Sequence, residues 1–460
     1  MDVLVGVSKL INSLAPVNQL PPEILGMIPN HQEDQTPDEL VTVSGVCSYW
    51  RDTFLATPSL WTKLDGRGIE KTRAWILRSR GLPIQLEVEG SPDLQVMKFL
   101  APHFPRLDVM DLSCLGARDR FLVTHNHLAK LLRPNSLLRV IDICASDLET
   151  LDTPVIMGGE FPSLEKLLVM GIKTSITNLR TPNLRDLFLA GKFHLTSLLD
   201  FLESSPLLES VILQLDPLQD TFVGNPREIA LGKLKSLNFF YHGFIILQHL
   251  LLPPGGEVMT VEAISPDQLH GTTSSYAQLL SRAFNNLPMS HQAVFFSFQT
   301  EDNCRAVSLE GPNGTLKLMT NEIEDPTACI TLLRLFAQHS FGSIRHLTID
   351  ELDLLPGDSQ LVTDFVRSLD NLRSMAMYRM NISPWLWALG ANHCPRLHDL
   401  HLQDQSRRPF DCHEIAGFVK ERSEAGIPIR MLCVGDYSGG PSDAEVMEIL
   451  QKYVEHVLWT

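Results

Sequence analysis

The chain has 460 residues, 44% of them hydrophobic, and a formal net charge of −16. The length and hydrophobic content suffice for a folded core, whereas the acidic balance argues against nucleic acid, which needs a basic binding surface. The longest apolar candidate for a membrane span, residues 239–252, is too short and is interrupted by His242, Gln248 and His249. We therefore expect neither a nucleic-acid nor a membrane partner.

The 8 cysteines are scattered and form no Cys-x-x-Cys pair. This usage is typical of a reducing compartment, where thiols serve as small buried hydrophobes. The first residues also lack the basic segment of a secretory signal. We expect a cytoplasmic or nuclear protein.

The first predicted helix begins near Leu20-Pro21-Pro22, because proline is tolerated in a first turn. Leu20, Ile24 and Ile28 follow at a spacing of four and predict one apolar face. Gly26 weakens this helix and Pro29 ends it.

The next helix has a capping box at Thr36-Pro37-Asp38-Glu39. Alternating steps of three and four predict that one helical stripe continues to residue 54, formed by Leu40, Val43, Cys47, Trp50 and Phe54. Thr57-Pro58 then predicts a third helical start, just before Trp61.

These segments resemble the F-box, in particular that of the large fungal family of F-box-like proteins. The matching pieces are LPPEIL at 20–25, LVTVSGVCSYWRD at 40–52, TPSLW at 57–61 and TRAWILRSRGLPIQLEVEG at 72–90. The resemblance covers about the first 90 residues. It predicts an F-box-like helical module at 1–68, then a linker helix and first strand at 69–90.

The resemblance implies docking on a Skp-type adaptor protein and, through it, on a cullin complex that acts as a ubiquitin ligase. The implied adaptor-binding residues are Leu20, Pro21, Pro22, Ile24, Leu25, Ile28, Leu40, Val43, Val46, Cys47 and Trp50. Trp61 is expected to pack internally. Position 29 is Pro, where the family commonly has a large apolar residue. The alternative is that these helices only cap the repeats that follow.

An apolar pattern of the form Leu-x-x-Leu-x-Leu recurs across residues 91–460. Its copies are Leu107-Met110-Leu112, Leu138-Ile141-Ile143, Leu164-Leu167-Val169, Leu184-Leu187-Leu189, Leu208-Val211-Leu213, Leu234-Leu237-Phe239, Ile344-Leu347-Ile349, Leu372-Met375-Met377, Leu397-Leu400-Leu402 and, more weakly, Ile429-Leu432-Val434. The closing period of two predicts a strand with one buried face. Amphipathic stretches predict helices at 194–204, 359–370, 383–391 and 412–424.

Strand followed by helix, repeated, predicts an α/β fold: an irregular leucine-rich-repeat-like solenoid, or horseshoe, with a doubly wound α/β fold as the competing possibility. Residues 241–330 lack the motif and carry short strand patterns near 294–298, 305–309 and 315–319. We interpret this stretch as an irregular part of the solenoid or an insertion.

The residues that flank the strand leucines should lie on the concave face of such a solenoid. In the middle copies they are apolar, which makes Leu168, Met170, Phe188, Ile212 and Phe240 the candidate substrate-binding residues. The alternative is that both faces of the strands are covered, with residues 241–330 folded back over them.

No nucleotide, nucleophile-elbow or zinc-protease motif is present, and we expect neither an enzyme nor a cofactor or metal site. The sequence predicts a substrate-recognition subunit of a cullin–RING ubiquitin ligase, with a protein substrate bound by the solenoid. The second hypothesis is a leucine-rich-repeat scaffold for protein binding without a ubiquitin link, and an unrecognised hydrolase is the weakest.

Overall fold

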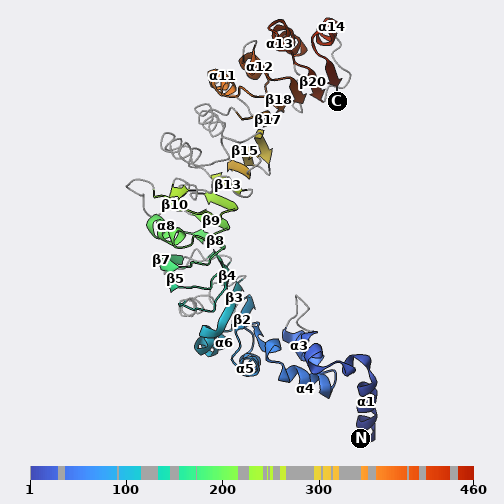
Figure 1. Cartoon of the computed structure of the whole chain (residues 1–460), viewed down its shortest axis with the longest axis vertical. Coiled ribbons are helices and arrows are strands. Elements are labelled where there is room, and N and C mark those ends of the chain that lie inside the picture. The colour runs from blue at the N-terminus through green and yellow to red at the C-terminus, as the bar shows by residue number, and fades with distance from the viewer. Residues whose placement is uncertain are drawn as a thin grey trace. The chain divides into compact units, whose positions relative to one another are not determined.

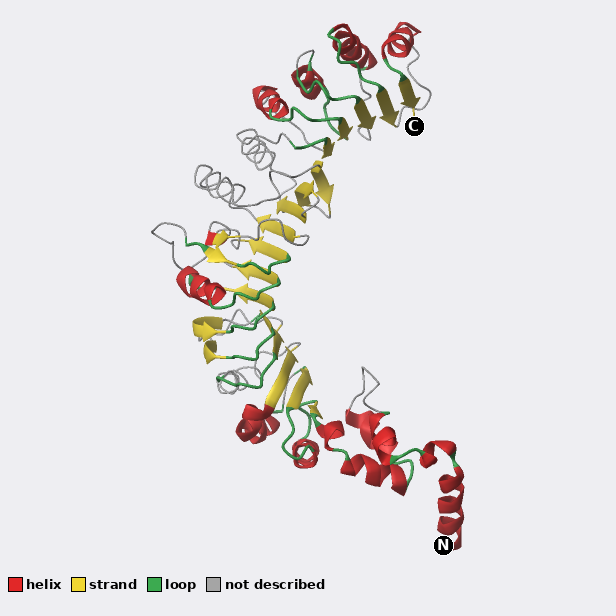
Figure 2. Ribbon diagram, in the orientation of Figure 1, coloured by secondary structure: helices red, strands yellow, loops and turns green. Residues whose placement is uncertain are grey.

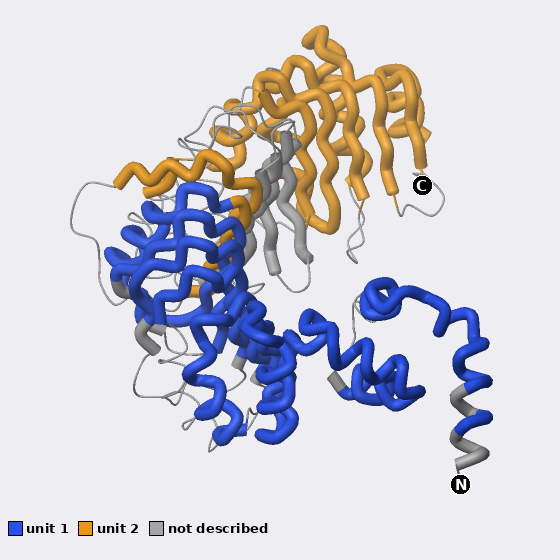
Figure 3. Tube along the Cα trace, turned by 60° about the horizontal axis from the view of Figure 1, so that its bottom comes forward, with its two compact units in different colours: residues 1–208, 218–222 blue, residues 209–217, 223–460 orange. Residues whose placement is uncertain are grey.

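The computed structural model divides the chain into two compact units, residues 1–208 with 218–222 and residues 209–217 with 223–460 (Figures 1 and 3). It describes residues 2–28, 37–90, 93–114, 133–145, 155–171, 174–215, 227–241, 246, 249–251, 259–265, 295–301, 304–311, 314–320, 343–350, 359–390, 393–403, 411–435 and 444–459. Together these residues form a mixed α/β fold with parallel sheets and an N-terminal helical region.

The helical region contains short helices, as the sequence predicts. They are α1 (Asp2–Leu14), the 3-10 helix η1 (Pro16–Gln19), α2 (Pro22–Met27), α3 (Pro37–Ser44), α4 (Ser48–Ala56) and the 3-10 helix η3 (Pro58–Trp61). Proline occupies the first turn of α2 and of η3, which confirms these two predicted starts. Pro29 and the cap residue Thr36 lie outside the described residues.

The prediction of one continuous helix from Leu40 to Phe54 is wrong. The helix ends at Ser44, where the amides of Gly45 and Val46 bond three residues back, to the carbonyls of Thr42 and Val43. Cys47 is extended and precedes α4. Glycine is a poor interior helix residue, so this is where the chain breaks. The apolar spacing continues across the break and conceals it.

The first unit contains a parallel sheet in the order β1-β2-β3-β4-β6-β8. These strands are β1 (Lys63–Leu64), β2 (Ile84–Glu89), β3 (Leu107–Cys114), β4 (Val140–Ala145), β6 (Lys166–Met170) and β8 (Asp186–Gly191). Helices α5 (Ile69–Arg78), α6 (Leu94–Leu100) and α8 (Leu195–Glu203) and the 3-10 helix η4 (Ala101–Arg106) complete the unit, with a separate parallel pair, β5 (Val155–Glu160) and β7 (Thr174–Arg180).

The second unit contains a longer sheet, in the order β9-β11-β13-β16-β15-β14-β17-β18-β19-β20-β21. The strands are β9 (Ser210–Leu215), β11 (Ser236–Tyr241), β13 (Met259–Ser265), β14 (Phe295–Glu301), β15 (Cys304–Gly311), β16 (Gly314–Thr320), β17 (His346–Asp350), β18 (Ser374–Tyr378), β19 (Asp399–Gln403), β20 (Met431–Gly435) and β21 (His456–Trp459). Only β15 runs antiparallel to its neighbours among these strands. A small parallel pair, β10 (Ile229–Ala230) and β12 (Leu250–Leu251), is separate.

Helices α11 (Ser359–Arg367), α12 (Ser383–Leu389), α13 (Cys412–Glu424) and α14 (Ala444–Tyr453) lie in a row along one side of β17 to β20 (Figure 2). Together with α8, the first three match the four predicted helical stretches, although α8, α11 and α12 are shorter than predicted.

In every copy of the apolar motif the last two apolar residues lie in a strand, and the copies on paired strands are in register. Met110, Ile141, Leu167 and Leu187 pair in one row of the first unit, and Leu347, Met375, Leu400 and Leu432 in one row of the second. These side chains are at most 2% exposed. The motif therefore forms stacked rows of core residues on one face of each sheet.

Strands in the motif-free stretch belong to the sheet of the second unit. β13 pairs with β11 and β16, while β14 pairs with β17. Strands β13 to β16 therefore lie inside the sheet, between β11 and β17. The described strands of 241–330 therefore do not cover a face of their own sheet. Residues 266–294 and 321–342 lie outside the described part of the chain.

Candidate functional site

The predicted adaptor-binding residues have three different environments in the structure. Pro21, Pro22, Ile24, Ile28 and Val46 are exposed, Leu20, Val43, Cys47 and Trp50 are half-buried, and Leu25 and Leu40 are buried. The exposed apolar side chains are substantial: Ile24 is 47% exposed, Ile28 41% and Val46 61%. These three are the residues most accessible to a partner.

Leu25 and Leu40 belong to the core of the helical region, at 0% and 3% exposure. Close packing around α2 explains the position of Leu25. A Cβ on the neighbouring Gly26 would lie 2.9 Å from Oγ1 of Thr57, so the glycine allows α2 to approach the start of η3. We therefore assign Leu25 and Leu40 a supporting role beneath the surface rather than direct contact with a partner.

Trp50 and Tyr49 hold α4 against the segment that precedes α2. The indole nitrogen of Trp50 donates to the side-chain oxygen of Asn18, and the Tyr49 hydroxyl donates to the Leu20 carbonyl over 2.7 Å. The Trp50 ring also meets Phe54 edge-on, with ring centroids 5.7 Å apart. Tyr49 thus positions Leu20, while Trp50 anchors Asn18 and leaves only part of its own ring accessible.

Trp61 packs internally, as the sequence predicts. It is 1% exposed, its indole nitrogen donates to the Phe54 carbonyl over 2.8 Å, and its ring meets Trp75 edge-on at 4.7 Å. The guanidinium of Arg78 lies 4.4 Å from the Trp61 ring centroid. Because Trp75 and Arg78 belong to α5, these contacts fix the helical region against the first repeat.

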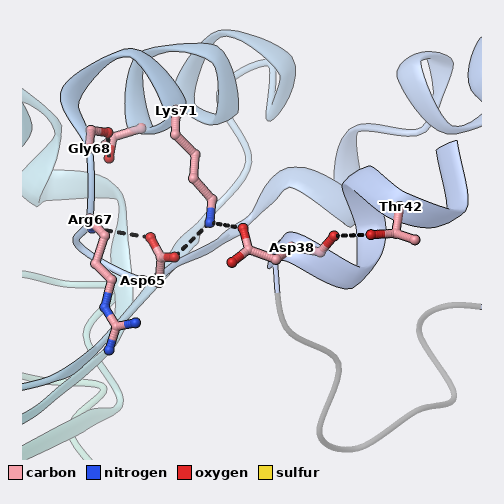
Figure 4. A network of polar contacts seen from close by, with 7 residues as sticks. Asp38, Thr42, Asp65, Arg67, Gly68 and Lys71 are labelled. Carbon is pink, nitrogen blue, oxygen red and sulfur yellow. Dashed lines mark hydrogen bonds and ion pairs between the residues drawn. The ribbon is translucent and has the colours of Figure 1, made fainter. Parts of the chain in front are cut away.

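A polar bridge also connects the helical region to α5 (Figure 4). The ammonium of Lys71 on α5 lies 2.5 Å from Asp38 on α3 and 2.7 Å from Asp65. The hydrogen bond and the charge of Lys71 lower the pKa of Asp38. Burial alone would lower the pKa of Lys71, but its bonds to Asp38 and Asp65 outweigh burial and raise that pKa. Both shifts favour the ionised pair of Lys71 and Asp38, which links α5 to α3.

The exposed apolar surface is larger than the residues carried over from the F-box motif. Met27 and Val41 are each 49% exposed. Helix α1 presents another apolar stripe, formed by Val7, Leu10, Ile11 and Leu14, at 49% to 68% exposure. Their spacing of three, one and three residues was visible in the sequence, but no motif drew attention to it.

The candidate substrate-binding residues divide between the two units. Leu168 and Met170 on β6 and Phe188 on β8 are half-buried, and Leu168 pairs in register with Phe188. Ile212 on β9 is also half-buried and belongs to the second unit, as does Phe240 on β11, whose side chain lies outside the description. The described part of the first unit therefore presents a small apolar patch, formed by Leu168, Met170 and Phe188.

Acidic residues adjoin this patch in the same row as Leu168. Glu87, Asp111 and Asp142 pair in register across β2, β3 and β4. Partial burial, and then the charge of Asp142, raise the pKa of Asp111. Lys166 offsets part of this charge, with its ammonium 3.0 Å from Asp142.

Within the described residues, no group of three or more His, Cys, Asp or Glu side chains is placed to hold a metal ion. Burial raises the pKa of the Cys394 thiol to about 12, and burial followed by Asp142 and Asp111 raises that of Cys144. Neither thiol is activated as a nucleophile. The described helices include none with the length and apolar character to cross a membrane.

A scan against models of protein families finds no match for this chain, and no curated protein matches it in sequence. The case for a function therefore stands on the residues and their geometry.

Proposed function

We propose that this chain is an F-box adaptor, the substrate-recognition subunit of a cullin–RING ubiquitin ligase. In this proposal the N-terminal helical module binds a Skp-type adaptor, and the repeats bind a protein substrate. The repeats would form an irregular leucine-rich-repeat-like solenoid, since stacked in-register strands with helices on one side are what such repeats require. The protein contributes binding rather than chemistry.

The observation that carries the proposal is the exposure of Ile24, Ile28 and Val46 beside the buried core residues Leu25 and Leu40. Each occupies a position that the F-box motif assigns to adaptor contact, and together with Met27 they leave considerable apolar surface in water. The bonds of Trp50 and Tyr49 and the Lys71 bridge hold the supporting helices in place. A rigid set of exposed apolar residues is typical of a protein-binding site.

The second candidate function, a repeat scaffold whose helical module is only a cap, has its own support. Trp61, Trp75 and Lys71 fix the module to the first repeat, as a cap requires. Capping and docking use different residues. The capping contacts involve the buried Trp61 and Trp75 and the half-buried Lys71, whereas the proposed docking residues are exposed apolar side chains. The two functions can therefore be separated by mutation.

A binding experiment with two variants tests the proposal. Ile24→Asp with Val46→Asp places charge on the proposed surface and should abolish binding of a purified Skp-type adaptor. Leu77→Asp is the matched control, since Leu77 is 79% exposed on α5 and is not among the implied adaptor-binding residues. It should bind like the wild type. Wild-type protein that fails to bind the adaptor at micromolar concentration contradicts the proposal and leaves the scaffold.

A further inference from the structure

The second residue of each repeat motif follows a charge pattern that changes along the chain. In the first six copies these residues are Asp108, Arg139, Glu165, Arg185, Glu209 and Lys235, which alternate in sign. In the last four they are Arg345, Arg373, His398 and Arg430, with no acidic residue among them. Asp108 is the second residue of β3, and each of the others lies directly before a strand, at the rim of a sheet.

Backbone bonds place consecutive rim residues on adjacent strands. The Arg139 amide donates to the Asp108 carbonyl over 2.8 Å, and the Arg373 amide to the Arg345 carbonyl over 2.7 Å. His398 and Arg430 continue this second row in the same way, at 3.0 and 2.8 Å. Adjacent strands lie about 4.8 Å apart, so side chains at these positions are neighbours.

In the early repeats, alternating charge gives rim residues on paired strands an opposite neighbour. Arg139 pairs with both carboxylate oxygens of Asp108, at 2.6 and 2.7 Å, and Lys235 lies 2.9 Å from Glu209. The hydrogen bond and charge of Asp108 raise the pKa of Arg139, and Glu165 adds to this effect. Here the row of rim residues stabilises its own sheet.

The late repeats lack this alternation of acidic and basic rim residues. Arg345, Arg373 and Arg430 are exposed, and none forms an ion pair with an acidic side chain in the described part of the chain. His398 lies 2.8 Å from Asp399, and Glu455 precedes the next strand beyond Arg430. The arginines therefore form a positive strip. Burial lowers the pKa of His346 beside this strip, and the charges of Arg345 and Arg373 lower it further.

Like charges on adjacent strands destabilise a sheet, so this strip costs stability that alternating charges would have gained. Exposed guanidinium groups with no internal acceptor are well suited to bind carboxylates from another molecule. We propose that Arg345, Arg373, His398 and Arg430 form a docking strip for an acidic segment of a partner protein. The docking strip depends on the proposed function in one respect, because the partner protein is taken to be the substrate that the chain recruits.

An acidic protein segment fits the strip better than nucleic acid does. The chain as a whole carries a charge of −16, which repels a long polyanion. The strip has only four basic side chains, one of them beside Asp399. A few carboxylates of an extended peptide, each able to accept two bonds from one arginine, match that number.

The test uses a fluorescein-labelled oligoglutamate peptide and anisotropy titrations at low salt. Arg373→Glu replaces a positive charge by a negative one within the strip, because the new carboxylate lies between Arg345 and His398. We expect binding weaker by about tenfold or more, the scale of several exposed ion pairs. The melting temperature should stay equal or rise. Lys420→Glu makes the same charge change at an exposed position on α13 and should leave binding unchanged.

A second variant guards against a folding artefact: Arg345→Gln, Arg373→Gln and Arg430→Gln together add no new charge and should also weaken binding. The inference is overturned if Arg373→Glu binds the peptide as tightly as Lys420→Glu, if the wild type shows no saturable binding, or if a labelled single-stranded oligonucleotide binds more tightly than the peptide. Adaptor binding by Arg373→Glu is measured in parallel. Its retention separates failure of this strip from failure of the proposed function.

Discussion

Leu167→Ala probes the row of core residues that joins the repeats of the first unit. Leu167 is 0% exposed and pairs with Ile141 on one side and Leu187 on the other. Removing roughly three buried carbons costs about 0.8 kcal/mol each in transfer free energy, and the remaining cavity adds to that. We expect about 3–4 kcal/mol in total, within the roughly 2–5 kcal/mol typical of buried leucine deletions.

Hydrogen exchange followed by mass spectrometry shows where that loss appears. If interactions are mainly between neighbouring repeats, β4, β6 and β8 lose protection first, while β18 to β20 in the second unit remain protected. Leu207→Ala is the control, because Leu207 is 37% exposed and its truncation removes less buried surface and should cost clearly less than Leu167→Ala. Equal loss of protection in both units would contradict stabilisation mainly between neighbouring repeats, since it would indicate one cooperative core.

Three further predictions concern single side chains. Arg422 is fully buried and donates hydrogen bonds to the carbonyls of Leu389, Gly390, His393, Cys394 and Leu397. Arg422→Met should therefore lower the free energy of unfolding, measured in urea, by about 3–5 kcal/mol. A decrease below about 1 kcal/mol would refute this. Cys394, with a thiol pKa of about 12, should resist iodoacetamide at mildly alkaline pH until the protein is unfolded, and rapid alkylation of the folded protein would contradict its burial. Because the pKa of Asp111 is raised in the folded protein, its charge opposes folding at pH values above that pKa. Asp111→Asn should therefore leave the melting temperature at neutral pH equal or higher. Asp108→Asn breaks the ion pair with Arg139 and should lower the melting temperature.

The strands were predictable because each copy of the motif combines a period of two with strongly apolar residues. Their spacing alone is enough to assign Met110, Ile141, Leu167 and Leu187 to a core. The pairing of β13 and β16 across a long stretch of chain was not predictable, because hydrogen-bonded partners leave no periodic signal in sequence.

The helix break at 45–47 was concealed because steps of three and four residues continue across it. Burial within the helical module was also not predictable, since Ile24 and Leu25 are adjacent and equally apolar, yet only tertiary packing makes Leu25 core and leaves Ile24 exposed. The change in charge at the rim was present in the sequence. It becomes visible once the repeats are aligned and their second residues compared.

The central claim is that the helical module docks on a Skp-type adaptor. Its most direct test is gel filtration of the purified wild-type chain mixed with a purified adaptor at micromolar concentration, with the mass of the complex determined by light scattering. We expect a complex of one chain with one adaptor, which Ile24→Asp with Val46→Asp should prevent and Leu77→Asp should not. Separate elution of the wild-type chain and the adaptor would contradict it.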